Sequence, residues 1–350
     1  MYYGKINIRM KTPPTLTDSH PPRLFPTILS GFNTVANNIS LILLPVFVDL
    51  ILWLGPKLKL ETLLLPSVSN LTTSLLKLGS ADIQDTIKSS QQMWTQILSQ
   101  FNLGIAVRTF PVGVPSLVAR EMIVDSPLGK MWQYQAPTLG VALLVFLALV
   151  ILGFFLGSIY FNSLARYTAK PVEKLNFKKL MFQYGESIVM ALILLVIILI
   201  LAIPILLVLS AISLISAGLA DFVILMALFA MLWLILPLIF SPHGVYVINQ
   251  KAFPSMMLSI RMVRFFLPGT GMFIVTAALI SEGLNMVWTL PEATSWLTLI
   301  GIAGHAFVVT ALVAASFIYY REGLRWMQDT IQRMSAPMSK PENGGPFGSI

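Results

Sequence analysis

A carboxylate stands inside one of the most apolar segments of this sequence. The segment LILLPVFVDLILWLGPKL covers residues 41–58, and Asp49 is its one acidic residue. A carboxylate at the centre of a bilayer costs about 2.5–3.5 kcal/mol, and one nearer the edge costs less. Asp49 lies six residues before Gly55, which places it about 9 Å from the end of a helical span. Its side chain must do chemistry, hold helices together, or mark the edge of the hydrocarbon layer.

Two polar residues are candidate neighbours of Asp49. Asn38 lies eleven residues earlier, close to three helical turns, so one continuous helix would place both residues on one face. His305 lies nine residues after Trp296, about 13 Å into the last apolar segment and at a depth similar to that of Asp49. An Asp49–His305 pair could handle protons, because histidine titrates near neutrality and intramembrane ionisable residues often mark proton pathways. We favour the alternative that each side chain fixes helix packing, because one acid and one histidine are too few for a pathway.

The sequence contains no signature of enzyme or metal chemistry. It has no cysteine, which excludes disulfides, thiolate metal sites and cysteine nucleophiles. It has no Walker phosphate loop, no HExxH zinc motif and no GxSxG nucleophile motif. The three histidines, His20, His243 and His305, fall in a tail, a loop and a span. We therefore expect a protein that is not an enzyme and that uses no cofactor and no metal.

Composition identifies the class of protein. Hydrophobic residues make up 56% of the 350 residues and charged residues 11%, whereas soluble domains average about 25% charged. The net charge of +8 is distributed between apolar segments and is not gathered on one soluble face, so no nucleic-acid partner is expected. The sequence predicts an integral membrane protein whose partner is the lipid bilayer, and it identifies no protein partner.

Apolar segments predict an all-α fold, a polytopic bundle with six transmembrane spans and a helical extracytoplasmic insertion. The predicted spans cover residues 39–54, 137–160, 188–214, 222–240, 265–280 and 296–320. The chain then divides into a flexible cytoplasmic tail (1–28), a first span (29–55), an insertion (56–136), a five-span bundle (137–334) and a disordered cytoplasmic tail (335–350). Gly153 and Gly157 form a small-xxx-small pair, which permits close helix approach in membranes.

The insertion differs from the rest of the chain in its charge and its periodicity. It carries seven basic and five acidic residues, so we expect it to lie outside the bilayer core. An amphipathic helix is predicted where apolar residues share an arc of about 100°, and a shorter helix is predicted just before it. The two apolar sets are Ile83, Ile87, Trp94, Ile97, Leu98 and Phe101, and Leu71, Leu75 and Leu78. We expect these helices to lie on the membrane surface or to cap the bundle.

Two basic loops contain candidate lipid contacts. PVEKLNFKKLMF (171–182) and SMMLSIRMVRFFL (255–267) interleave basic residues with Leu, Met and Phe. Such segments bind anionic lipids, with about 1 kcal/mol for each basic residue near the surface. Ordinary orientation charge is the alternative explanation, and we favour it slightly. The candidate contacts are Lys174, Lys178, Lys179, Arg261 and Arg264.

Three segments resemble a known group of proteins. NMVWTLPEATSWLTLIGIAGHAFVVTALVAASFIYYREGLRWMQ (285–328), SMMLSIRMVRFFLP and LLPVFVDLILWLGPKL are similar to uncharacterised prokaryotic six-helix membrane proteins. These resemble the membrane domain that precedes the catalytic part of some glycerophosphodiester phosphodiesterases. The resemblance covers residues 30–327 and implies a six-helix bundle, but the catalytic barrel is missing, so it implies no catalytic residue. The family often has Asn where this chain has His305, which favours a packing role for that side chain.

These observations predict the function only in outline. We expect a non-enzymatic, multi-pass protein of the prokaryotic plasma membrane that acts on or organises membrane components. The alternative is a small-solute or lipid transporter that uses a polar interior around Asn38, Asp49 and His305.

The distribution of basic residues predicts which side of the membrane each loop faces. Sixteen of the 23 Lys and Arg residues lie in the two terminal segments and in the loops 161–184 and 241–264, and the two other short loops contain none. By the positive-inside rule, both termini should be cytoplasmic. A single cysteine introduced at Met338 should react only with reagents that reach the cytoplasm, and the native chain adds no cysteine background. Labelling of that cysteine from outside would reverse the predicted topology.

Overall fold

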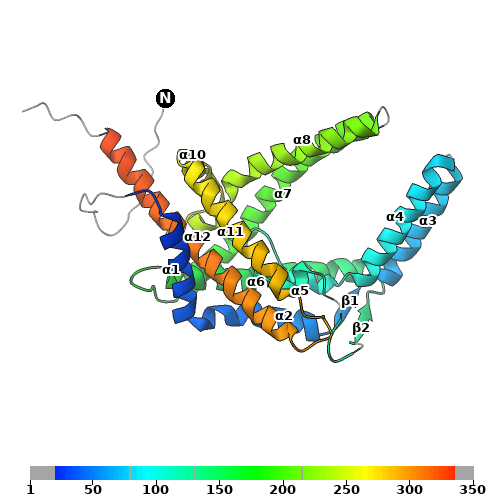
Figure 1. Ribbon diagram of the computed structural model, residues 1–350, viewed down its shortest axis with the longest axis horizontal. Coiled ribbons are helices and arrows are strands. Elements are labelled where there is room, and N and C mark those ends of the chain that lie inside the picture. The colour runs from blue at the N-terminus through cyan, green and yellow to red at the C-terminus, as the bar shows by residue number, and fades with distance from the viewer. Residues whose placement is uncertain (1–19, 79–80, 124, 130, 214–215, 336–350) are drawn as a thin grey trace, which may run out of the picture.

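The computed structural model describes residues 20–78, 81–123, 125–129, 131–213 and 216–335. In this part of the chain nearly all regular structure is helical, and two strands of three residues each form its one sheet. The predicted all-α fold is confirmed. Figure 1 shows a body of crossing helices from which two helical hairpins project, α3–α4 and α7–α8.

Five helical segments among the described residues are long and apolar enough to cross a membrane, and a bent pair of helices is a sixth candidate. The protein thus has the helices of a multi-pass membrane protein. The five segments are α6 (Leu139–Tyr167), α7 (Phe177–Ser213), the run Gly218–Ile248, α11 (Leu267–Trp288) and α12 (Thr298–Ser335).

The predicted loop 241–264 is mostly helical in the structure. The run Gly218–Ile248 covers all but the first residue of α8 (Ala217–Ile235), the 3-10 helix η3 (Leu236–Leu238) and α9 (Ser241–Ile248), and α10 (Ala252–Phe265) follows it. Pro242 lies in the first turn of α9, where proline costs no hydrogen bond. The segment predicted as a loop therefore consists mainly of two helices.

The first predicted span is not one continuous helix. It consists of α1 (Leu24–Asn37), the 3-10 helix η1 (Ile39–Ile42) and α2 (Leu43–Leu54), with a bend of 93° between the two halves. Asn38 has φ −138° and ψ 65° at the bend, and its side-chain amide donates to the carbonyl of Thr34 (2.8 Å). This bond provides a donor for one of the carbonyls that have no helical partner at the end of α1. The expectation that Asn38 and Asp49 share one helical face was wrong, because Asn38 lies at the bend and is not part of the helix that carries Asp49.

Helix α12 is the central helix of the bundle. In its most apolar stretch 61% of the residues are buried, compared with at most 17% in the other four candidate spans. Its small residues let neighbouring helices approach closely: a Cβ on Gly31 of α1 would lie 2.6 Å from the Cβ of Ala315. A Cβ on Gly304 would likewise lie 2.6 Å from the ring of Trp288 on α11. Small residues at helix contacts are the usual basis of packing in membranes, where apolar burial alone does not drive association.

The insertion begins and ends at the small parallel sheet. Strand β1 (Lys57–Lys59) pairs with β2 (Gln133–Gln135), and the hairpin of α3 (Glu61–Leu78) and α4 (Ala81–Gln100) lies between them in the chain. The two predicted insertion helices are therefore present, and Figure 1 shows them projecting together from the body. The 3-10 helix η2 (Leu103–Val107) and α5 (Leu117–Arg120) complete the insertion.

Part of the insertion packs into the core of the bundle, a contact that its charges did not indicate. Val112, Val114 and Leu117 are at most 1% exposed and belong to the same buried cluster as residues of α2, α6 and α12. A Cβ on Gly157 would lie 2.8 Å from the Cα of Gly113, and Gly153 faces Val107 and Thr109. The two glycines of α6 therefore admit the backbone of the insertion and not another span. Other parts of the protein thus surround this irregular backbone.

Lys57 fastens the insertion to the end of α2. Its side chain is buried, and Nζ donates to the carbonyls of Leu52 (2.6 Å) and Trp53 (3.2 Å). Carbonyls in the last turn of a helix lack helical partners and attract positive charge. Burial, reinforced by the charge of Lys59, lowers the pKa of Lys57 from 10.5 to about 8.

We expect Lys57 to make the protein more stable as the pH rises from about 8 to about 10. In this range the unfolded chain, with a pKa near 10.5, still binds a proton that the folded protein has lost. Thermal unfolding in detergent should show wild type gaining stability relative to Lys57→Met over this range. Lys88→Met, at an exposed position of α4, should follow wild type. A constant difference between wild type and Lys57→Met would contradict the prediction.

Candidate functional site

Asp49 is fully buried on α2 and accepts three hydrogen bonds from the insertion. Its Oδ1 accepts from the Ser116 hydroxyl and from the backbone N–H of Val118 (3.0 Å), and its Oδ2 accepts from the N–H of Leu117 (3.0 Å). Ser116 in turn accepts from the N–H of Ala119 (3.0 Å). Together, Asp49 and Ser116 cap the N-terminus of α5, where unpaired N–H groups and the helix dipole favour a negative charge.

The arrangement around Asp49 suits a structural role. Both carboxylate oxygens are engaged by donors of the protein itself, and two of these donors are backbone groups that cannot move without unfolding α5. Arg108 lies near enough to act electrostatically on the carboxylate. A carboxylate held in this way joins α2 to the insertion.

No hydrogen bond or ion pair joins Asp49 to His305 among the described residues, so the hypothesis of an Asp49–His305 pair gains no support. Helix α5 packs against both α2 and α12, so its N–H groups take up the acceptor positions of Asp49. His305 is buried on α12, and its Nδ1 has no hydrogen-bond partner within the described part of the chain. The charged groups that act on His305 are Arg120, Arg108 and Glu282. Asn38, Asp49 and His305 therefore do not form one polar site.

Charged residues of α5 fasten it to α11 as well. Arg120 forms ion pairs with Glu282 and with its neighbour Glu121 (Nε–Oε1, 3.2 Å). The Glu121 carboxylate also accepts a hydrogen bond from the amide of Asn285 (2.8 Å). The short helix α5 is thus held from three sides, by α2, α11 and α12.

A second buried polar cluster joins α6, α7 and α9, and the sequence did not predict it. The Tyr246 hydroxyl donates to Ser158 (2.9 Å) and contacts the hydroxyl of Ser187 (2.8 Å). Gln183 accepts from the amide of Asn162 (2.7 Å) and donates to the carbonyls of Val245 and Tyr246 (3.4 Å each). Such bonds hold membrane helices together. These residues are dispersed over 88 positions of the chain, so no local spacing indicated the cluster.

The predicted lipid contacts on α10 lie on an exposed stripe. Phe253 (60% exposed), Met257 (37%), Arg261 and Arg264 fall within about 80° of the helix circumference. The opposite face, which includes Met256 and Met262, is buried against the bundle. The Glu186 carboxylate accepts from the N–H of Ala252 (2.7 Å) and caps the start of the helix. Neither arginine forms an ion pair with any described residue.

The basic loop before α7 is partly neutralised. Lys179 forms an ion pair with Glu173 (3.0 Å), so its charge is already matched. Lys174 and Lys178 are exposed and have no ion pair among the described residues. Leu175 and Phe177, which alternate with them, are 60% and 67% exposed. Four of the five predicted lipid contacts, Lys179 excepted, thus present an unmatched charge beside exposed apolar side chains.

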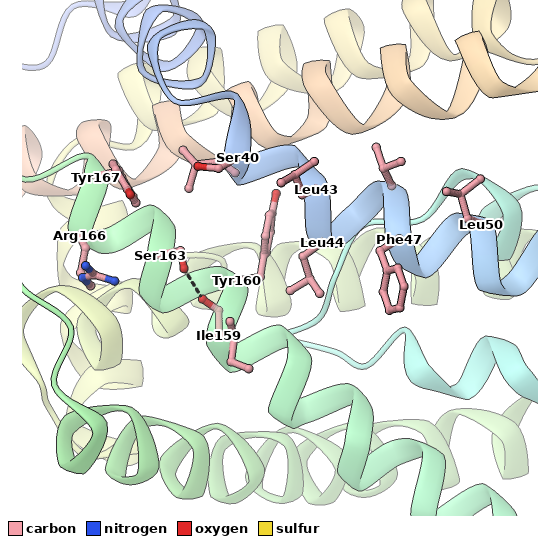
Figure 2. A pocket seen from close by; sticks show the side chains of 12 residues that line it. Ser40, Leu43, Leu44, Phe47, Leu50, Ile159, Tyr160, Ser163, Arg166 and Tyr167 are labelled. Carbon is pink, nitrogen blue, oxygen red and sulfur yellow. Dashed lines mark hydrogen bonds between the residues drawn. The ribbon is translucent and has the colours of Figure 1, made fainter.

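A groove of about 670 Å³ lies between the η1–α2 segment and α6. Twelve residues line it, from residues 40–50 and 159–167. Figure 2 shows Arg166 and Tyr167 at one end of the groove and Phe47 and Leu50 at the other. The sequence did not predict this groove, because its two walls are more than 100 residues apart in the chain.

Comparison with known protein families, with curated proteins and with solved structures finds no match to this chain. Within the described residues no group of three or more His, Cys, Asp and Glu side chains is placed to hold a metal ion. The resemblance to six-helix membrane proteins remains a prediction.

We expect Asp49 to be coupled energetically to Ser116 and not to His305. Asp49→Asn replaces an acceptor of charge-assisted bonds by an amide and should cost about 1–3 kcal/mol of stability. The double variant Asp49→Asn/Ser116→Ala should lose less stability than the two single variants together, because both residues cap α5. In the double variant Asp49→Asn/His305→Asn, the loss of stability should equal the sum of the two single losses to within about 0.5 kcal/mol. Thermal unfolding of the single and double variants measures both coupling energies. A larger coupling of Asp49 with His305 than with Ser116 would disprove the assignment of Asp49 as a cap of α5.

Proposed function

We propose that this chain is a six-span, non-enzymatic protein of the prokaryotic plasma membrane that organises membrane components by gathering anionic lipids at its inner face. In this proposal the bent pair α1–α2 counts as one span, and both termini are cytoplasmic. The distribution of basic residues supports this orientation. In Figure 1 the α3–α4 hairpin lies at the opposite end of the molecule from α10 and the C-terminal end of α12, as this topology requires.

The observation that carries the proposal is the exposed stripe of α10. Its buried face is fixed by side-chain hydrogen bonds: Ser259 donates to the carbonyl of Pro237 (2.7 Å), and Ser255 donates to that of Ser241. The opposite face therefore presents Phe253, Met257 and two unmatched arginines to the surroundings in a fixed register. Apolar and basic side chains on one face of a helix suit the boundary between acyl chains and headgroups.

Lys174 and Lys178 extend this basic surface. The first turns of α7 lie beside the start of α10, as the bond from Ala252 to Glu186 indicates. Four unmatched cations at the inner surface, each contributing about 1 kcal/mol, would hold an anionic lipid shell at moderate salt. Because these charges are exposed, salt should weaken this attraction.

The transporter hypothesis has less support. It needs Asn38, Asp49 and His305 to line one polar interior, but Asn38 caps α1 and Asp49 caps α5. No other observation on the described residues favours a path for a solute through the bundle.

The proposal predicts a change in the lipids around the protein when the stripe is neutralised. The protein is reconstituted in membranes of equal amounts of phosphatidylglycerol and phosphatidylcholine with the same acyl chains, and the retained lipid shell is measured by mass spectrometry. Wild type should enrich phosphatidylglycerol, and Arg261→Gln/Arg264→Gln should reduce this enrichment about two- to fivefold. Lys77→Gln/Lys88→Gln removes the same charge from the α3–α4 hairpin and should change nothing. Full enrichment in the α10 variant would refute the proposal.

A further inference from the structure

The groove between the η1–α2 segment and α6 has an apolar length and a polar end. Leu44, Phe47 and Leu50 line the apolar length. Its floor is formed by Tyr160, which is buried and donates to the hydroxyl of Thr310 on α12 (3.0 Å). Leu43 and Phe47 at the rim are 63% and 58% exposed, so the groove opens to the side of the bundle.

The polar end of the groove carries a cation with free donors. Arg166 donates through Nε to the carbonyl of Glu173 (2.9 Å), and its guanidinium carbon lies 5.9 Å from the ring centre of Tyr167. Its two terminal nitrogens have no hydrogen-bond or ion-pair partner among the described residues. The hydroxyls of Ser40 and Tyr167 at this end are likewise without a partner in that part of the chain. No acidic residue lines the groove.

We propose that this groove is a binding site for one anionic phospholipid of the surrounding leaflet, with an acyl chain along α2 and the phosphate against Arg166. A volume of about 670 Å³ is within the range of about 300–1,000 Å³ that is usual for small-ligand sites. A groove that opens sideways into a bilayer is in contact with acyl chains and not with water. The occupant is therefore taken from the bilayer itself.

Charge, and not apolar contact, should select this lipid. Acyl chains are as apolar as the leucines of the groove, so exchanging a chain between bilayer and groove changes little free energy. The guanidinium group matches the geometry of a phosphate and forms paired hydrogen bonds with it. Arg166 lies in the last turn of α6, beside the loop that leads to α7, which places this pairing on the same side as the basic stripe of α10.

This inference goes beyond the proposed function, because it concerns different residues and a single lipid held in one orientation. Either can fail without the other. The α10 variant tests the lipid shell, whereas the groove variants below test one tightly retained molecule.

The test uses the full-length protein purified in mild detergent from membranes of equal amounts of phosphatidylglycerol and phosphatidylcholine with the same acyl chains. Native mass spectrometry then counts the lipid that remains bound to each protein molecule. Wild type should retain one lipid, with about a fivefold preference for phosphatidylglycerol. Arg166→Gln should retain the two lipids equally, and Leu44→Trp, which fills the groove, should retain neither. Lys170→Gln removes an exposed charge four residues away and should behave as wild type.

Three results would overturn the proposal. The first is equal retention of the two lipids by wild type. The second is an unchanged preference in Arg166→Gln, which does not depend on whether Leu44→Trp folds. The third is a lipid-free dimer that Leu44→Trp converts to a monomer, which would make a second copy of the chain the occupant of the groove.

Discussion

A buried backbone that is not helical must find partners for its N–H groups, and this constraint organises the part of the bundle around α5. The segment before α5 runs against α6 at Gly153 and Gly157, where glycine leaves room for another backbone. Helix α5 is a single turn, so most of its N–H groups have no helical partner. Asp49 accepts from two of them and from Ser116. Without that carboxylate, α5 would leave unpaired donors among apolar side chains.

The position of α2 follows from this contact. Asp49, Lys57 and Trp53 fasten α2 to the insertion and to the loop before α12, where the Trp53 indole donates to the carbonyl of Ala293 (3.1 Å). Its other end is set by the 93° bend after α1, and α1 lies close against α12 through Gly31. Held on these sides, α2 leaves a gap toward α6, and this gap is the groove that ends at Arg166. The contacts of Asp49 thus help to shape the groove between α2 and α6.

The two proposed lipid contacts use the same cation–phosphate attraction under different physical conditions. The α10 stripe is exposed along its whole length, so the proposed attraction for anionic lipids would be diffuse and screened by salt. Arg166 is half-buried at the end of a groove and offers directed donors, which favours one lipid in one orientation. The buried cluster around Tyr246 and Gln183 holds α6, α7 and α9 together next to both contacts.

The sequence by itself determined the class of the protein, because a charged fraction of 11% and long apolar segments allow little else. It also predicted two consecutive helices in the insertion and a basic segment at 255–267, and it favoured a packing role for Asp49. Only the tertiary structure decided which atoms bond to Asp49, because backbone N–H groups are present at every residue and have no signature in a sequence. The bend at Asn38, the insertion segment facing Gly153 and Gly157, and the groove also appeared only there. Each depends on segments that lie far apart in the chain, and their contact depends on packing and not on local periodicity.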